Sequence, residues 1–145
     1  NREQKTMPVN SDANNNQRRI EGLKAMEKDI LKEKMDSLAR GVYAVTKFFP
    51  KDEIYGLTSQ IRRASLSVIL NYIEGFARGR DKELKNFLHI SYGSLKETKY
   101  LLFFCTREEY IKKDQYEKLM VLTDEIGAML WKRIEKVKAK IVDDK

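Results

Sequence analysis

The chain has 145 residues, of which 41% are hydrophobic and 35% charged, with only 7 Gly and 2 Pro, a composition typical of one helix-rich globular domain. Its single Cys excludes an internal disulfide, and with a single His it argues against a zinc site and favours a reducing compartment. The 29 Lys and Arg against 22 Asp and Glu give a net charge of +7, which favours an acidic partner: nucleic acid, an anionic membrane surface or an acidic protein.

The first nineteen residues are rich in Asn, Ser, Asp and Gln and have almost no apolar periodicity. Such a segment buries too little apolar surface to offset the entropy of ordering, so residues 1–19 are expected to be a flexible polar tail. Residues 20–145 are expected to form the folded domain. No stretch approaches the ~18 apolar residues of a membrane span, and the amino terminus lacks the apolar core of a signal peptide, so we expect a soluble cytoplasmic protein.

The first two helices are predicted on either side of Pro50. Apolar residues at three- and four-residue spacing predict one long helix from about Ile20 to Phe49, because proline disfavours helix in the residue before it. Asp52 is placed to cap the second helix, whose apolar face runs from Ile54 to Phe76. Its second half is apolar almost all the way round, which implies contacts on more than one side.

A basic turn around Gly79 leads to the third helix, which Asp81 is placed to cap. The core-facing positions of this helix are Leu84, Leu88, Ser91, Leu95, Thr98, Leu102 and Cys105. A second apolar row lies beside them and is predicted to be an oligomer interface, because contiguous apolar surface on soluble proteins usually marks one. Its members are Phe87, Ile90, Leu101 and Phe104.

Asp114 and Glu117 fit a capping box at the start of a fourth helix, whose apolar face extends to Ile141. Short connections between long helices make neighbours antiparallel. The predicted fold class is therefore all-α, an antiparallel up-down-up-down four-helix bundle. The surplus apolar surface on the second and third helices predicts a closed homo-oligomer.

No catalytic constellation stands out: the sequence has no glycine-rich phosphate loop, nucleophile elbow or paired-histidine metal motif. We therefore predict no enzyme, no metal site and no cofactor. His89, between Leu88 and Ile90, is interpreted as a packed or interfacial residue. Cys105 is interpreted as a small buried hydrophobe, since reactive cysteines need an electropositive, accessible setting.

Asn71 and Glu74 are polar residues inside the most apolar stretch of the chain. Buried polar groups need hydrogen-bond partners, so we interpret the pair as a structural network that reaches Ser91 or Ser94 on the third helix. A catalytic or ligand-binding role is the alternative. Gly75 beside them is predicted to allow close helix approach, which would compensate for its poor helix propensity.

Basic residues concentrate on the second helix and around the turn that follows it. Such a patch suits phosphate contacts, and a merely solvated helix face is the alternative. No aromatic residues are interleaved with these positions as in single-strand binders, so base-specific readout is not indicated. The candidate nucleic-acid-binding residues are Arg62, Arg63, Arg78, Arg80, Lys82 and Lys85.

Three segments, residues 55–64, residues 71–76 and residues 93–97, resemble the four helix bundle protein family. This family contains the proteins encoded in intervening sequences of 23S rRNA genes and is related to the accessory variability determinant proteins of diversity-generating retroelements. The resemblance covers about residues 38–141. It implies a four-helix bundle assembled as a barrel-shaped homopentamer, without known catalysis, whose accessory branch binds nucleic acid and a reverse transcriptase. Ile69 stands where relatives commonly have a proline, so an unkinked second helix would follow.

Two functions therefore compete. The first is a nucleic-acid-binding accessory protein, with RNA or DNA and a reverse transcriptase as partners. The second is a purely structural homo-oligomer, encoded in an rRNA intervening sequence, that binds protein. An enzyme is a distant third hypothesis.

Overall fold

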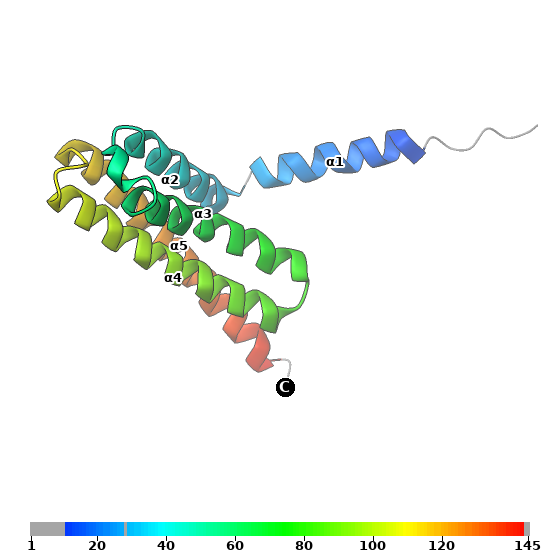
Figure 1. Cartoon of the computed structure of the whole chain (residues 1–145). Coiled ribbons are helices and arrows are strands. Elements are labelled where there is room, and N and C mark those ends of the chain that lie inside the picture. Colours follow the sequence, from blue (N-terminus) through cyan, green and yellow to red (C-terminus); the bar gives the residue numbers. More distant parts are fainter. Residues whose placement is uncertain (1–10, 28, 144–145) are drawn as a thin grey trace, which may run out of the picture. The chain divides into compact units, whose positions relative to one another are not determined.

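The computed structural model describes residues 11–27 and 29–143, and within them every regular element is a helix (Figure 1). The elements are α1 (Ser11–Glu27), α2 (Ile30–Thr46), the short 3₁₀ helix η1 (Lys51–Glu53), α3 (Leu57–Arg78), α4 (Asp81–Arg107) and α5 (Lys113–Asp143). The chain divides into two compact units, residues 1–30 and residues 31–145. The all-α prediction is confirmed for the described residues.

The helix α1 occupies part of the predicted tail. Residues 11–21 are helical and exposed, and Gln17 Nε2 donates to Glu21 Oε1 one turn later at 3.3 Å. Residues 11–19 of the predicted flexible polar tail are therefore helical, whereas residues 1–10 lie outside the described residues. Pairs spaced by four residues support a polar helix that buries no apolar face.

The predicted continuous helix from Ile20 to Phe49 is also wrong, because α1 ends at Glu27 and α2 begins at Ile30. Asp29, a residue type that favours the N-cap, stands directly before α2. From there Leu31, Met35, Leu38 and Val42 are fully buried at helical spacing. The apolar periodicity that predicted a core-facing helix thus belongs to α2 alone.

Helices α2 to α5 share one hydrophobic core, and α3 and α4 lie side by side in Figure 1. Polar contacts link α5 to two other helices. Lys34 Nζ on α2 donates to Glu125 Oε2 on α5 at 2.5 Å, and Arg133 on α5 donates to the hydroxyl of buried Tyr72 on α3. The largest fully buried side chains come from all four helices: Tyr72, Leu31, Met35, Leu38, Ile61, Leu88, Leu95, Leu102, Ile126, Leu130, Ile134 and Val42.

Only two residues connect α3 to α4, which makes the two helices an antiparallel hairpin. Gly79 takes the left-handed conformation with φ of 73°, which glycine adopts without steric cost. A Cβ at Gly75 would lie 2.9 Å from the Cβ of Phe87 and 3.1 Å from Cδ1 of Leu84. The close approach predicted for Gly75 is confirmed.

The starts of α3 and α5 differ from the predicted caps. Asp52 lies within η1, and it is Glu53 Oε2 that accepts a hydrogen bond from the backbone N–H of Leu57 at 2.9 Å. α5 begins at Lys113, and the side chain that accepts a hydrogen bond from the backbone N–H of Lys112, at 3.3 Å, is that of Gln115 and not that of Glu117. Each helix start was predicted within a few residues, but the capping side chain was not.

None of the described helices has the length and apolarity that crossing a bilayer requires.

Candidate functional site

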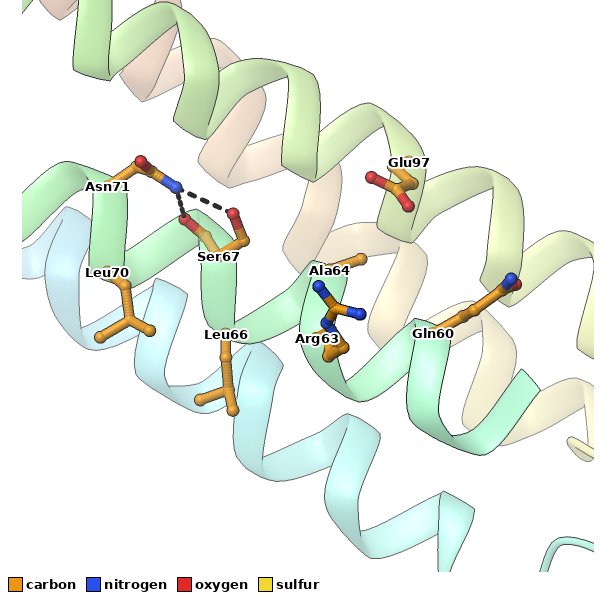
Figure 2. A pocket seen from close by; sticks show the side chains of 8 residues that line it. All are labelled: Gln60, Arg63, Ala64, Leu66, Ser67, Leu70, Asn71 and Glu97. Carbon is orange, nitrogen blue, oxygen red and sulfur yellow. Dashed lines mark hydrogen bonds between the residues drawn. The ribbon is translucent and has the colours of Figure 1, made fainter. Parts of the chain in front are cut away.

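A shallow pocket of about 640 Å³ lies over α3 and reaches α4 (Figure 2). Seven of its lining residues come from α3 and one, Glu97, comes from α4. The lining contains both apolar and polar side chains, among them exposed Leu70 and the polar residues Asn71 and Ser67. The full lining is Gln60, Arg63, Ala64, Leu66, Ser67, Leu70, Asn71 and Glu97.

A hydrogen-bond network joins the two helices beside this pocket. Asn71 Nδ2 donates to the carbonyl and to Oγ of Ser67, both at 2.8 Å, and Figure 2 shows these two bonds. Ser67 Oγ lies 2.8 Å from Ser94 Oγ on α4, and one turn away Ser91 Oγ donates to the Val68 carbonyl at 2.6 Å. The predicted network of Asn71 with Ser94 therefore exists, but it runs through Ser67.

Glu74 does not belong to this network. It is exposed and accepts a hydrogen bond from Nε of Arg78 at 2.9 Å, one turn along α3. Its position in the apolar stretch suggested burial, but the apolar residues around it, Ile73 and Phe76, are themselves exposed at 38% and 48%. Glu74 therefore forms a surface ion pair.

Arg63 and Glu97 extend from α3 and α4 on two sides of the pocket (Figure 2). Both side chains are exposed, and neither has an ion-pair partner within 4.0 Å among the described residues. The pocket thus combines an uncompensated cation, an uncompensated anion and an amide–hydroxyl network. It presents polar recognition groups but no nucleophile paired with a general base.

The six predicted basic residues do not form one patch. Arg62 is half-buried: its Nε donates to Thr46 Oγ1 at 2.8 Å, and its guanidinium lies 4.5 Å from the centroid of the Tyr43 ring on α2. Arg62 and Arg63 are separated from Arg78 by four turns, about 22 Å of helix. The prediction of a single contiguous surface is wrong, because helix geometry divides it into two groups.

The second group surrounds the α3–α4 turn and is called the turn cluster below: Arg78, Arg80, Lys82 and Lys85. Arg78 pairs with Glu74 and lies 5.3 Å from the centroid of the Phe87 ring. Arg80 and Lys82 are exposed and Lys85 is half-exposed, and none of the three has an ion pair with a described residue. Three cations of the turn cluster are therefore available to a ligand.

The predicted oligomer interface is only partly at the surface. Ile90 is 50% and Phe104 is 38% exposed, whereas Phe87 is half-buried under Arg78. Leu101 is 8% exposed and belongs to the core, so its assignment to an interface is corrected.

Cys105 and His89, both on α4, differ in burial. Cys105 is fully buried, and burial, with smaller contributions from Glu53 and Glu108, raises the pKa of its thiol from 9.0 to about 11. His89 is half-buried on α4. Among residues 11–27 and 29–143 no three Cys, His, Asp or Glu side chains gather as metal ligands.

Residues 27–132 match the model of the 23S rRNA-intervening sequence protein family. The chain belongs to this family. A solved structure from Bacteroides thetaiotaomicron, described as a protein of unknown function from the S23 ribosomal protein family, superposes with a TM-score of 0.67 at 27% identity. The match covers 72% of this chain and 98% of that chain. No match was found among curated proteins.

The family resemblance predicted from three short segments is confirmed, and the matched region contains α2, α3, α4 and most of α5. α3 continues through Ile69 as a single α-helix. Of the pocket residues, Gln60, Ser67, Leu70 and Glu97 were not predicted to be functional. Ser67 had a usable signal, because it lies one turn before Asn71 on the same helix face.

Proposed function

We propose that this protein is a non-enzymatic accessory protein that binds nucleic acid through the turn cluster. The observation that carries the proposal is the presence of three cations, Arg80, Lys82 and Lys85, without ion pairs to described residues within one two-turn segment. Lys and Arg side chains with this freedom suit phosphate oxygens and carry no sequence preference by themselves. The net charge of +7 adds long-range attraction for a polyanion.

RNA is the nucleic acid that the family's description favours, since that description names an intervening sequence of 23S rRNA. The reverse transcriptase remains a prediction from the resemblance alone. The proposal includes no catalysis, because the candidate site offers charge and hydrogen bonds rather than a reactive group.

A salt titration tests the turn cluster. Affinity for a single-stranded RNA is measured by fluorescence anisotropy over a range of salt concentrations, for the parent and for Arg80→Gln/Lys82→Gln/Lys85→Gln. Each lost phosphate contact lowers the slope of log affinity against log salt by about 0.7, so the triple variant should lose about 2 units of slope. Helicity and unfolding midpoint should change little, because surface charges contribute little to stability.

A control variant removes the same number of charges elsewhere. Lys47, Lys51 and Lys112 lie in the connections at the opposite ends of α3 and α4 and are exposed. Their replacement by Gln should leave the slope at the parent value. If the turn-cluster variant keeps the parent slope, the cluster is a solvated face, and the alternative of a purely structural protein-binding oligomer takes its place.

We infer further that α2 to α5 form an up-down four-helix bundle that assembles as a homopentamer. Exposed apolar residues on α3 and α4 support self-association: Leu70 is 58%, Ile90 50% and Tyr100 61% exposed. Gly93 adds a second argument, because it is exposed in the middle of α4 and a Cβ there would meet nothing within 4 Å. An interior helical glycine costs about 1 kcal/mol, which close approach of another subunit would offset.

Light scattering tests the assembly. The parent should have a multiple of the 17.0 kDa chain mass, five in the form proposed. Ile90→Glu should dissociate it while leaving helicity intact, whereas Val121→Glu, at a residue 58% exposed on α5, should leave the mass unchanged. A parent mass of one chain at micromolar concentration would contradict the proposal.

A further inference from the structure

A second hollow, about 270 Å³ in volume, lies between α4 and α5 and differs in chemistry from the pocket over α3. Two aromatic residues line it: Tyr92 on α4 and Trp131 on α5, with ring centroids 5.4 Å apart and planes inclined by 50°. Trp131 is 44% exposed. Tyr92 is half-buried and packs against the core, so Trp131 is the ring of the pair that is exposed at the surface.

Lysines surround this aromatic pair. Lys96 Nζ lies 5.2 Å from the Tyr92 ring centroid, and Lys138 Nζ lies 5.5 Å from the Trp131 ring centroid. Lys99, which also lines the hollow, pairs with Asp124 at 2.8 Å, and Lys138 approaches Glu135 at 3.6 Å. Lys96 has no ion pair with a described residue, so the rim carries more positive charge than its carboxylates neutralise.

Two small residues, Gly127 and Ala128, also line the hollow. A Cβ at Gly127 would meet only Leu95 Cδ2, at the ordinary contact distance of 3.5 Å, so packing with α4 does not require glycine there. The absence of a side chain instead leaves the hollow open beside Trp131. A volume of 270 Å³ lies below the range of about 300–1,000 Å³ for drug-sized ligands, which favours a single planar ring system.

We propose that the hollow between α4 and α5 binds one base of a single-stranded nucleic acid, stacked on Trp131 beside Tyr92, with Lys96, Lys99 and Lys138 at the flanking phosphates. Stacking on aromatic residues within a basic groove is the general mode by which single strands are held without sequence preference. An acidic peptide would also use the lysines, and oligoglutamate tests that alternative below. This site is additional to the turn cluster, and it rests on the proposed function only in sharing nucleic acid as the ligand.

The hollow and Ile90 lie on different flanks of α4. At 3.6 residues per turn, Tyr92, Lys96 and Lys99 lie on the flank of α4 opposite to Ile90 and Glu97. The first flank faces α5, as the Lys99–Asp124 pair requires, and the second faces the α3 side. A substitution at Ile90 therefore does not alter the lining of the hollow in the same subunit.

Trp131 is the only tryptophan of the chain and reports directly on stacking. The first experiment adds single-stranded oligouridylate to the full-length protein and follows tryptophan emission, with an abasic sugar–phosphate strand of equal length as the control. Stacking predicts quenching by the base-containing strand and little by the abasic strand. Equal quenching by both strands, or binding of the base-containing strand without quenching, overturns the proposal but leaves the turn cluster unaffected.

Variants test the same site by anisotropy of a labelled strand. Tyr92→Leu and Ala128→Glu, the latter placing a carboxylate at an exposed alanine of the lining, should each weaken binding of the base-containing strand about tenfold. Ala44→Glu makes the same change at an exposed alanine of α2 and should leave binding at the parent level. Because Ala128 is exposed, its variant remains informative if Tyr92→Leu fails to fold. Parent-level affinity for Ala128→Glu overturns the proposal.

Two further outcomes separate this proposal from the function above. If the turn-cluster variant keeps the parent affinity, salt slope and quenching, the proposal that the turn cluster binds nucleic acid is wrong and the proposal for the hollow is retained. If oligoglutamate changes tryptophan emission as much as oligouridylate does, the hollow is an acidic-peptide site and the stacking proposal is wrong.

Discussion

Replacing Gly75 by alanine isolates the close contact between α3 and α4. Two effects of opposite sign compete: a helical alanine gains up to about 1 kcal/mol over glycine, whereas overpacking costs about 1–3 kcal/mol. The new Cβ would lie 2.9 Å from Phe87 Cβ, an atom fixed by its backbone, and 3.1 Å from Leu84 Cδ1. Because Phe87 can yield only if α4 shifts, we expect a net loss of about 1–2 kcal/mol.

Gly127→Ala is the matched control, since it makes the same chemical change where the new Cβ meets Leu95 Cδ2 at 3.5 Å. Without a clash, the propensity gain should remain and stabilise the protein by about 0.5–1 kcal/mol. Urea unfolding followed by circular dichroism at one protein concentration measures both changes, since the stability of an oligomer depends on concentration. If Gly75→Ala equals or exceeds the parent in stability while Gly127→Ala is stabilised, the hairpin has room for a methyl group and the close-contact argument is wrong.

Three other predictions concern separate parts of the chain. Because the pKa of Cys105 rises on folding from 9.0 to about 11, its contribution to stability should be complete well below pH 9 and fall by about 2 kcal/mol as the pH rises to 11. Urea unfolding of Cys105→Ala should lack this loss. In the same assay Asn71→Ala should lower the free energy of unfolding by about 0.5–1.5 kcal/mol, and Glu74→Ala should lower it by less than about 0.5 kcal/mol. The difference is expected because Asn71 joins the network with Ser67, whereas Glu74 forms a surface ion pair. Deleting residues 1–21 should leave the melting temperature of the remaining chain within about 2 °C of the parent, because residues 11–21 are exposed.

The core was the most predictable part of the structure. Positions such as Ile61, Val68 and Leu102 were identified by spacing and are buried, because a helix that packs against others must repeat its apolar residues every three or four positions. α1 was missed since it has no apolar face, so the signal that predicts packed helices is absent from it. The helix break between α1 and α2 was missed because the few apolar residues before it, Ile20 and Leu23, fall at spacings that continue the apolar pattern of α2.

The candidate sites were less predictable, because they depend on which helices become neighbours. Tyr92 and Trp131 lie on different helices, far apart in the sequence, and only the packing of α4 on α5 brings their rings together. The sequence of a single helix therefore does not reveal that aromatic residues lie beside the lysines. Glu74 was misplaced because an apolar stretch does not reveal which of its residues remain exposed.

The two-residue connection between α3 and α4 bears on the order in which the protein folds. Contacts across this hairpin begin next to the turn, at Gly75 and Leu84, and extend outward to Ser67 and Ser94, which are 27 residues apart. The contact between α2 and α5 through Lys34 and Glu125 spans 91 residues. Loop closure costs less entropy for the short separation, so the hairpin should form early and α2 and α5 should dock later. During synthesis the hairpin emerges before α5 has been made, so the part of its apolar face that packs on α5 stays exposed until that helix emerges.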